Sequence, residues 1–162
     1  MARDLDIIQT ERLILRGINE TDAIKIVEWR SDPEVYRFFK SPHKITVREH
    51  VAWYNNSYLP NENRFDWMCI EQSSGKRIGV FGLVRDEDLC EVNYLLASEA
   101  QHKGFAAEAI KSLMDYAAKN CGIRHVVAEI HKNNQQSIAL VLKLGFKIIS
   151  QNDPFAVYGI EV

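Results

Sequence analysis

The chain has 162 residues and a formal net charge of −2, with 46% hydrophobic and 26% charged residues, which is ordinary for a globular protein. This length predicts one domain, residues 1–162, whose core needs neither metal nor disulfide support. The charge argues against a nucleic-acid-binding protein, and three cysteines without zinc-motif spacing predict free thiols in a reducing cytoplasm.

The first third of the chain predicts a strand followed by two helices. Residues 12–18 alternate as a strand does, and Asn19 or Thr21 can cap the helix that follows. The apolar stripe expected for that helix is Ile24, Val27 and Trp29. Residues 31–33 should end it, because the residue before a proline disfavours helical geometry.

A capping box at Thr46 and Glu49 predicts the second helix. Its inward face would carry four residues at helical spacing: Val47, Val51, Tyr54 and Tyr58.

The middle of the chain predicts an antiparallel meander of three strands, at residues 65–71, 77–84 and 90–97. A turn at residues 73–76 joins the first two strands. The second strand contains Gly79 and Gly82, which would let neighbouring groups approach its backbone closely.

The last third predicts helix, strand, helix and two closing strands. The long helix after the loop 98–103 has a clear apolar stripe, formed by Phe105, Ala109, Ile110, Leu113 and Ala117. Gly122 suits the left-handed position just past its end. A strand follows at residues 124–130, and its parallel crossover from 90–97 makes the fold class α/β (α+β) with a mixed sheet.

The final helix would start at Asn133 or Asn134 and stop at Gly145. Its inward residues should be Ile138, Val141 and Leu142. Residues 146–149 and 155–161 read as the two closing strands.

The loop Gln101-His102-Lys103-Gly104-Phe105-Ala106 runs from a strand directly into the long helix. The first N–H groups of a helix lack internal partners, and the helix dipole adds partial positive charge there. Gly104 removes side-chain bulk, so the backbone could close around a diphosphate. Taken alone, this hexapeptide is more typical of an ordinary helix start, and its spacing matches neither a P-loop nor a Rossmann loop.

Four segments in this order resemble the GNAT acetyltransferase superfamily. The loop matches the family's pyrophosphate loop, Gln/Arg-x-x-Gly-x-Gly/Ala, and residues 91–96 look like its fourth strand. Asn134-Gln135-Gln136-Ser137 with Lys143-Leu144-Gly145-Phe146 is similar to the family's Asn-x-x-Ser…Lys-Leu-Gly-Phe segment. Thr10-Glu11-Arg12-Leu13-Ile14-Leu15-Arg16 resembles the first strand of the ribosomal-protein N-terminal acetyltransferase branch.

The resemblance covers nearly the whole chain and implies a GNAT fold. That fold has a mixed, mostly antiparallel central sheet, splayed fourth and fifth strands (91–97 and 124–130) and about four flanking helices. Acetyl-CoA would lie in the gap between the splayed strands. The implied contacts are the backbone of Leu95, Leu96 and Ala97, the loop residues Gln101, His102, Lys103, Gly104, Phe105 and Ala106, and Asn134. Asn134 fits a helix N-cap equally well.

The activity implied is direct transfer of an acetyl group to a primary amine in a ternary complex. Glu91 would be the catalytic base, although a solvated strand glutamate fits its position nearly as well. The tyrosine that many members use as general acid is replaced by Val141. Ser137 is the alternative acid that the ribosomal-protein branch implies, and local hydrogen bonding in the first helical turn is its other role. His131 is a further possible base, but fits a surface histidine better.

On the acceptor side, Trp29, Arg30, His50 and Trp53 resemble amino-sugar acetyltransferases, including those acting on nucleotide-linked 4-amino sugars. Each aromatic ring among them fits core or rim packing as well. The acceptor would be a small-molecule amine such as an amino sugar. A protein N-terminal α-amine of the ribosomal type is the alternative, and a polyamine or antibiotic amine stays open.

Two other functional classes remain open from the sequence. The missing tyrosine at Val141 would suit a CoA-binding sensor without catalysis, and Cys69 or Cys90 could carry an acyl group. The scattered histidines and carboxylates predict no metal. No apolar run has the length of a membrane span and no signal peptide is visible, so no membrane partner is expected. A homodimer is an option that the sequence does not decide.

Overall fold

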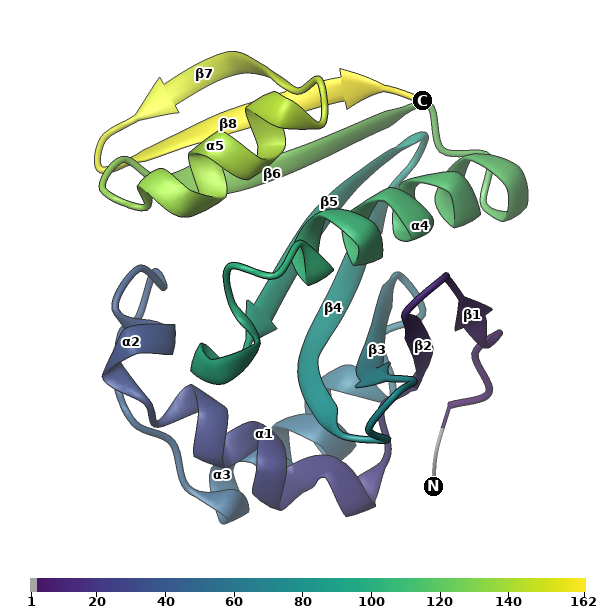
Figure 1. Cartoon of the computed structure of the whole chain (residues 1–162), viewed down its shortest axis with the longest axis vertical. Coiled ribbons are helices and arrows are strands. Elements are labelled where there is room, and N and C mark those ends of the chain that lie inside the picture. The colour runs from purple at the N-terminus through teal and green to yellow at the C-terminus, as the bar shows by residue number, and fades with distance from the viewer. Residues whose placement is uncertain (1–2) are drawn as a thin grey trace.

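A computed structural model describes residues 3–162. Its centre is an open eight-stranded sheet with strand order β1-β2-β3-β4-β5-β6-β8-β7, in which only β5 and β6 run parallel (Figure 1). The strands are β1 (Ile8–Gln9), β2 (Leu13–Gly17), β3 (Arg64–Glu71), β4 (Arg77–Asp86), β5 (Leu89–Leu96), β6 (His125–His131), β7 (Lys147–Asn152) and β8 (Phe155–Glu161). The helices are α1 (Ala23–Arg30), α2 (Pro33–Tyr36), α3 (Val47–Trp53), α4 (Phe105–Asn120) and α5 (Gln135–Lys143). The mixed, mostly antiparallel sheet is therefore confirmed.

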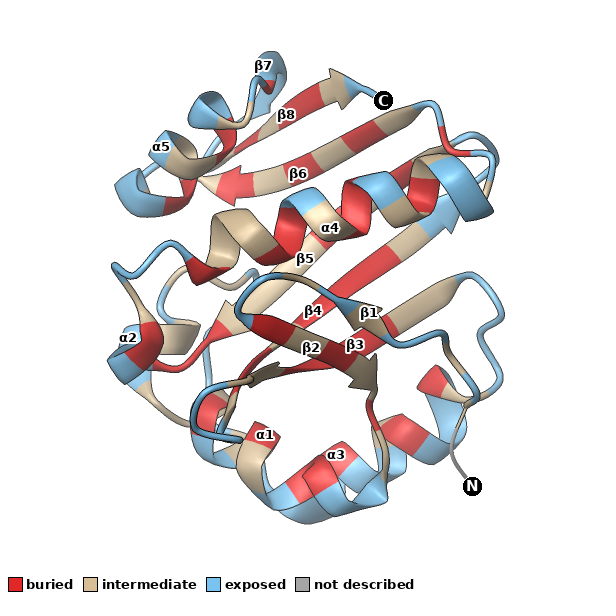
Figure 2. Cartoon of the chain, turned by 45° about the vertical axis from the view of Figure 1, so that its right-hand side comes forward, coloured by how far each residue is buried: buried red, intermediate tan, exposed pale blue. Residues whose placement is uncertain are grey.

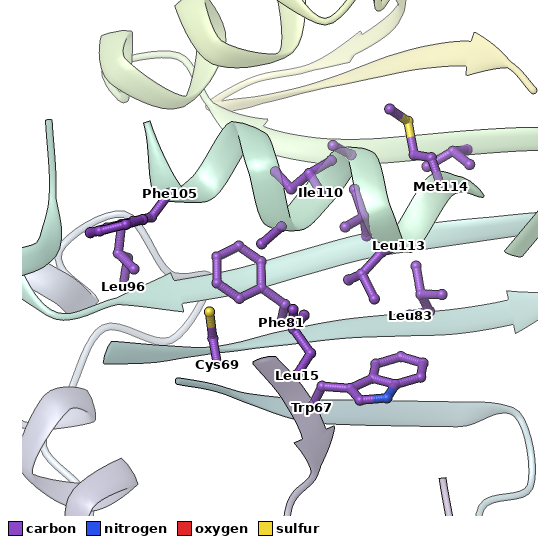
Figure 3. Packing of buried hydrophobic residues seen from close by; sticks show 14 of the residues in the cluster. Leu15, Trp67, Cys69, Phe81, Leu83, Leu96, Phe105, Ile110, Leu113 and Met114 are labelled. Atoms are coloured by element: carbon purple, nitrogen blue, oxygen red, sulfur yellow. The ribbon is translucent and has the colours of Figure 1, made fainter. Parts of the chain in front are cut away.

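Helix α4 packs its predicted apolar stripe onto one face of the sheet. Phe105, Ala109, Ile110, Leu113 and Ala117 are all buried. Figure 3 shows Phe105, Ile110 and Leu113 above side chains of β2 and β4, and Figure 2 shows the exposed residues of α4 turned away from the sheet. No helix within residues 3–162 has the length and apolar character needed to cross a bilayer.

The face of helix α1 that packs on the sheet differs from the face that the sequence predicted. Ala23, Ile26 and Trp29 are buried, whereas Ile24 is 73% exposed. The chain reaches α1 through a 3-10 turn at Glu20–Asp22, which Asn19 caps. That turn sets the phase of the helix, so an i, i+3, i+6 stripe faces the sheet.

In α3 the capping box at Thr46 is confirmed, but the predicted face is only half right. Val47 is 41% exposed, while His50, Tyr54 and Tyr58 are buried. The helix continues into a π-helical turn at Tyr54–Tyr58, and a wider turn shifts which side chains meet the sheet.

Around α5 the cap is Asn134, whose side chain accepts the N–H of Ser137 at 3.2 Å. Val141 is buried as predicted, but Leu142 is 51% exposed because only a narrow stripe of this helix packs on β6. The short helix α2 was not predicted; Asp32 caps its first turn, and it directly follows α1.

Strands β5 and β6 pair only at their beginnings. The parallel register runs through Leu89, Cys90 and Glu91, and beyond Glu91 the two strands separate (Figure 1). The predicted crossover and splay are therefore confirmed, and the sheet opens along the second half of β5.

Asp22 ties together the elements around α1. It is fully buried and receives bonds from both guanidinium nitrogens of Arg16 at 2.8 Å, from Arg77 at 3.2 Å and from the N–H of Asn19 at 3.0 Å. Burial by itself would raise the pKa of this carboxyl, but its hydrogen bonds and the Arg16 charge outweigh burial, so the net pKa is lowered.

Replacing Asp22 with alanine is expected to lower the free energy of unfolding by about 3–5 kcal/mol, since two guanidinium groups lose their partner. Because the folded pKa is depressed, the carboxylate's contribution is present above the unfolded value near 3.9 and is lost as the pH falls through the folded pKa. Urea unfolding across acidic pH measures both effects. Asp115→Ala, on the exposed side of α4, is the control and should change stability by less than about 0.5 kcal/mol. Equal losses in the two variants would contradict the assigned role of Asp22.

Candidate active site

A cavity of about 770 Å³ occupies the opening between β5 and β6. Its walls come from both strands, the loop before α4, the start of α5 and the segment around α2. The predicted site residues on its surface are Glu91, Leu95, Leu96, Gln101, His102, Gly104, Phe105, Ala106, Asn134 and Ser137. One cavity therefore gathers most of the residues implied in CoA binding, together with both implied catalytic residues.

The loop before α4 has a backbone shaped for an anion. His102 and Gly104 both adopt left-handed conformations, with φ of 63° and 81°. Alternating left- and right-handed residues turn successive N–H groups toward one side, which forms an anion-binding concavity. A left-handed residue other than glycine costs about 1–2 kcal/mol, and such strain concentrates at ligand sites. The Gln101 side chain donates to the Leu96 carbonyl at 3.1 Å and fixes where the loop begins.

Arg12, which directly precedes β2, braces this loop, a contact that the sequence did not predict. It donates to the Lys103 carbonyl at 2.9 Å, pairs with Glu108 at 2.7 Å and lies 4.4 Å from the centre of the Phe105 ring. Lys103 itself does not line the cavity; its main chain is instead the attachment point for Arg12. The sequence did show that Arg12 belongs to the Thr-Glu-Arg-Leu segment that resembles the family's first strand. Only the fold shows that its side chain contacts the loop before α4.

The Arg12→Met variant is expected to bind CoA about 3- to 10-fold more weakly. Methionine keeps an apolar stem over Phe105 but loses the bonds to Lys103 and Glu108, which are partly exposed and together worth about 1 kcal/mol. Isothermal titration with CoA measures the change. Lys111→Met, on the exposed side of α4, should bind as the parent does. An unchanged affinity in Arg12→Met would show that the loop holds its shape without the brace.

The main chain of β5 offers hydrogen-bonding groups to the opening. Ala97 donates its N–H to Ile78, and the Leu95 carbonyl faces Gly79 of β4. In an antiparallel ladder the bonded groups alternate, so the main chain of Tyr94 and Leu96 points toward the cavity. Of the expected pantetheine contacts at residues 95–97, only Leu96 therefore turns its main chain toward the cavity, and Tyr94 is added to it.

Tyr94 and Ser137 form a hydroxyl pair beside the CoA opening. Their oxygens lie 2.7 Å apart, and the Tyr94 ring stacks on Phe81 at 5.3 Å. Burial raises the pKa of Tyr94 and outweighs the opposing hydrogen bond from Ser137. Val141 also lines the cavity and brings no hydroxyl. Tyr94, which sequence reasoning missed, thus places a tyrosine hydroxyl in the cavity from β5.

Glu91 lies where β5 and β6 part, on the face opposite to α4. Burial raises its pKa, and the nearby Glu129 raises it further, against smaller opposing effects of Lys40 and Arg64. Lys40 forms an ion pair with Glu129 at 2.8 Å. A carboxylate with a raised pKa at the mouth of a cavity can take a proton from an ammonium group. The sequence did not single out Glu129, which is the one carboxylate within β6.

A second cavity of about 180 Å³ lies on that opposite face, between the sheet and helices α1 and α3. Arg30, His50 and Trp53 line it, as expected for an acceptor side. Trp29 does not line it and is instead buried in the core. The two cavities share Phe39 and residues 93–95, so they meet at β5.

The buried cysteines are unsuited to nucleophilic catalysis. Burial raises the pKa of both Cys69 and Cys90 to about 12, and neither residue lines either cavity. The thiolate, rather than the thiol, is the nucleophile. An acyl-cysteine route therefore has no support here. Within residues 3–162, no three metal-binding side chains come together as a group that could hold an ion.

Parted parallel strands, a loop with two left-handed residues at the start of α4 and a half-buried carboxylate are the arrangement expected of an acyltransferase. The sequence matches the family model described as an acetyltransferase (GNAT) domain over residues 12–147. The chain belongs to this GNAT family. The uncharacterized N-acetyltransferase YoaA of Bacillus subtilis is 29% identical over 146 residues, covering 87% of this chain and 82% of that protein.

Solved structures share the fold at low identity. Spermidine N-acetyltransferase from Vibrio cholerae, in complex with CoA and spermine, superposes with a TM-score of 0.82 at 18% identity, covering 94% of this chain and 96% of that one. An acetyltransferase from Salmonella typhimurium that modifies the N-terminal serine of ribosomal protein L7/L12 gives 0.82 at 16% identity, covering 97% and 99%. The family and the enzyme class follow from these matches; the acceptor does not.

Proposed function

We propose that this enzyme transfers the acetyl group of acetyl-CoA to a primary amine of a small molecule, such as an amino sugar, by direct attack in a ternary complex. The observation that carries the proposal is the meeting of two cavities at β5, one with an anion-binding loop and one on the Glu91 side of the sheet. The site of reaction would lie beside residues 93–95, which both cavities share. The three free cysteines suit a reducing, cytoplasmic compartment.

In this proposal the pyrophosphate binds the N–H groups at the start of α4, and the pantetheine pairs with the main chain of Tyr94 and Leu96. The amine nitrogen attacks the thioester carbonyl carbon; an amide bond forms and the carbon–sulfur bond breaks. Glu91 takes the proton released from the amine, directly or through water. For a lysine-like amine, forming the neutral nucleophile at pH 7 costs about 4–5 kcal/mol, so a base matters.

The leaving thiolate takes its proton from Ser137 as Tyr94 donates its own proton to Ser137 across their 2.7 Å hydrogen bond, and water then reprotonates the Tyr94 oxygen. The raised pKa of Tyr94 keeps that hydroxyl protonated at neutral pH, so a proton is available there. This pair would do the work of the tyrosine that Val141 replaces, and it argues against a sensor without catalysis.

Two measurements test the proposal. Acetyl-CoA should raise the melting temperature of the protein, and a panel of amino sugars, polyamines and N-terminal peptides should release free thiol from acetyl-CoA. The proposal expects turnover to be fastest with a small-molecule amine. No thermal shift would refute CoA binding, a shift without turnover would favour the sensor, and fastest turnover with a peptide would favour a protein N-terminus.

A further inference from the structure

We propose that the 180 Å³ cavity binds an anionic group on the acceptor, so that the substrate class is an amine that also carries a carboxylate or a phosphate. This inference rests on the proposed function and adds the second recognition element of the acceptor. Arg30 and Arg64 would hold the anion, while Asp66 and His50 would bind hydrogen-bond donors of the same molecule.

The floor of this cavity is a row across three strands. Asp66 of β3 pairs with Gly82 of β4, and Gly82 pairs with Asn93 of β5, so all three share one face. A Cβ at Gly82 would lie 2.1 Å from Asp66 Oδ1 and 2.9 Å from Asn93 Oδ1. Because Gly82 has no side chain, a hollow forms on this face of the sheet, and Asp66 Oδ1 and Asn93 Oδ1 lie at its edge.

Buried polar atoms in this cavity await a partner. Asp66 Oδ1 and His50 Nδ1 are both inaccessible to solvent, and among residues 3–162 neither has a hydrogen-bond partner. Leaving such atoms unpaired costs their full desolvation free energy, so native proteins rarely leave them without a hydrogen-bond partner. Asp66 Oδ1 lies at the hollow beside Gly82 and His50 lines the same cavity, so a ligand bound there would supply hydrogen bonds that the protein does not.

The charges of the cavity favour an anion. The cavity is lined by two guanidinium groups, of Arg30 and Arg64, but by only one carboxylate, that of Asp66. Arg64 already pairs with that carboxylate at 3.1 Å. Within the described chain no carboxylate lies at ion-pair distance from Arg30, whose guanidinium carbon lies 5.6 Å from the centre of the Phe39 ring. Burial, and then the charge of Arg64, lower the pKa of Arg30. Burial lowers the pKa of His50 too, so His50 adds no positive charge at neutral pH.

An anion between Arg30 and Arg64 would relieve their mutual repulsion and supply the missing counter-charge. Carboxylates and phosphates both match the planar donor set of arginine. A polyamine would instead add cations to a cavity that already has an excess of them. The amine of an anchored molecule would reach β5 near Asn93 and Leu95, where the two cavities meet.

Matched pairs of amines test the inference by thiol release from acetyl-CoA. The pairs are phosphoethanolamine with ethanolamine, glucosamine 6-phosphate with glucosamine, and glycine with glycinamide, and spermidine is tested beside them. The anionic member of at least one pair should have a kcat/KM about tenfold or more above its neutral partner. Phosphate and carboxylate pairs distinguish the two sources of the anion. Thermal shifts by the same compounds at saturating CoA report binding if turnover is slow.

Arg30→Gln and Arg64→Gln should each bring the anionic-to-neutral ratio close to one. Lys147→Gln removes an exposed cation outside both cavities and should keep the ratio. A thermal shift with CoA alone confirms that each variant is folded. Equal use of neutral and anionic amines, a preference for spermidine, no shift with any anionic amine, or a ratio that survives both arginine variants would overturn the inference. Failure of the proposed function would look different, because acetyl-CoA itself would then neither bind nor release thiol.

Discussion

The Glu91→Gln variant is expected to lower kcat by about 10²- to 10⁴-fold while leaving the affinity for CoA within about twofold of the parent. Glutamine keeps the size and polarity of the side chain but cannot take the proton that the acceptor amine must lose. Glu91 lies on the face of β5 opposite to α4, so its loss should leave the pyrophosphate loop unchanged. Steady-state kinetics and calorimetry with CoA measure the two quantities separately.

Glu129→Gln is the matched control for this variant. Glu129 is the neighbouring carboxylate on β6, and it is already engaged by Lys40 at 2.8 Å. Its loss removes a repulsion and should lower the pKa of Glu91, with less than about a tenfold change in kcat near neutral pH. If Glu129→Gln were the inactive variant and Glu91→Gln the active one, Glu129 would be the base.

The pH dependence of kcat/KM is a second test of Glu91 as the base. The folded pKa of Glu91 is raised above its ordinary value of 4.5, so the basic form is lost as the pH falls through that raised value. The acid limb of kcat/KM should therefore lie above 4.5 and move toward 4.5 in Glu129→Gln. An acid limb that persists unchanged in Glu91→Gln would belong to another group.

The parts of the fold that sequence predicted well are those with strong local signals. The stripe from Phe105 to Ala117 spans four turns, and every member of it is buried. Gly75, Gly122 and Gly145 all take positive φ angles at the predicted turn and helix ends. Such features depend on neighbours in the chain, which the sequence displays directly.

The errors in the fold come from helix phase, which depends on contacts distant in sequence. Apolar spacing predicts that Ile24 and Val47 face inward, yet both are exposed. In α1 a preceding 3-10 turn decides the phase, and in α3 a following π-helical turn does so. The register of a helix against a sheet is set by packing that apolar spacing alone does not reveal.

The candidate site also contains residues that the sequence could predict and residues that it could not. The loop 101–106 could be found because its residues are adjacent in the chain and its motif stands between two others. Tyr94 could not be paired with Ser137, nor Asp66 with Gly82 and Asn93, because these contacts join strands and helices far apart in sequence. Residues that act together across a sheet become visible only once the strand register is known.

The binding site of the acetyl donor and that of the acceptor are predicted from different kinds of structural feature. The proposed donor side depends on backbone geometry, which the left-handed His102 and Gly104 and the start of α4 set in this chain. The proposed acceptor side depends on individual side chains around the hollow at Gly82, namely Arg30, Arg64 and Asp66. Specificity should therefore change by substitution on this face without loss of CoA binding.

The Gly104→Val variant is expected to weaken CoA binding by about 30- to 100-fold, which corresponds to roughly 2–3 kcal/mol. Gly104 has a φ of 81°, where a β-branched residue is strained by about 1–2 kcal/mol or more. Its new Cβ would lie 3.3 Å from the Arg12 guanidinium, so the added methyl groups would press on the brace of the loop. Relief of that strain would rotate the N–H groups away from the pyrophosphate. Calorimetry with CoA gives the affinity, and urea unfolding gives the stability.

Gly122→Val is the matched control, because Gly122 also has a positive φ, of 66°, at the other end of α4. A Cβ at Gly122 would meet nothing within 4 Å, so this variant carries the backbone strain without touching the cavity. It should lose about 1–2 kcal/mol of stability and keep its affinity for CoA. If both variants lost stability equally and Gly104→Val still bound CoA normally, the loop would not be the pyrophosphate site. A loss of affinity confined to Gly104→Val would instead tie CoA binding to the left-handed geometry of this one residue.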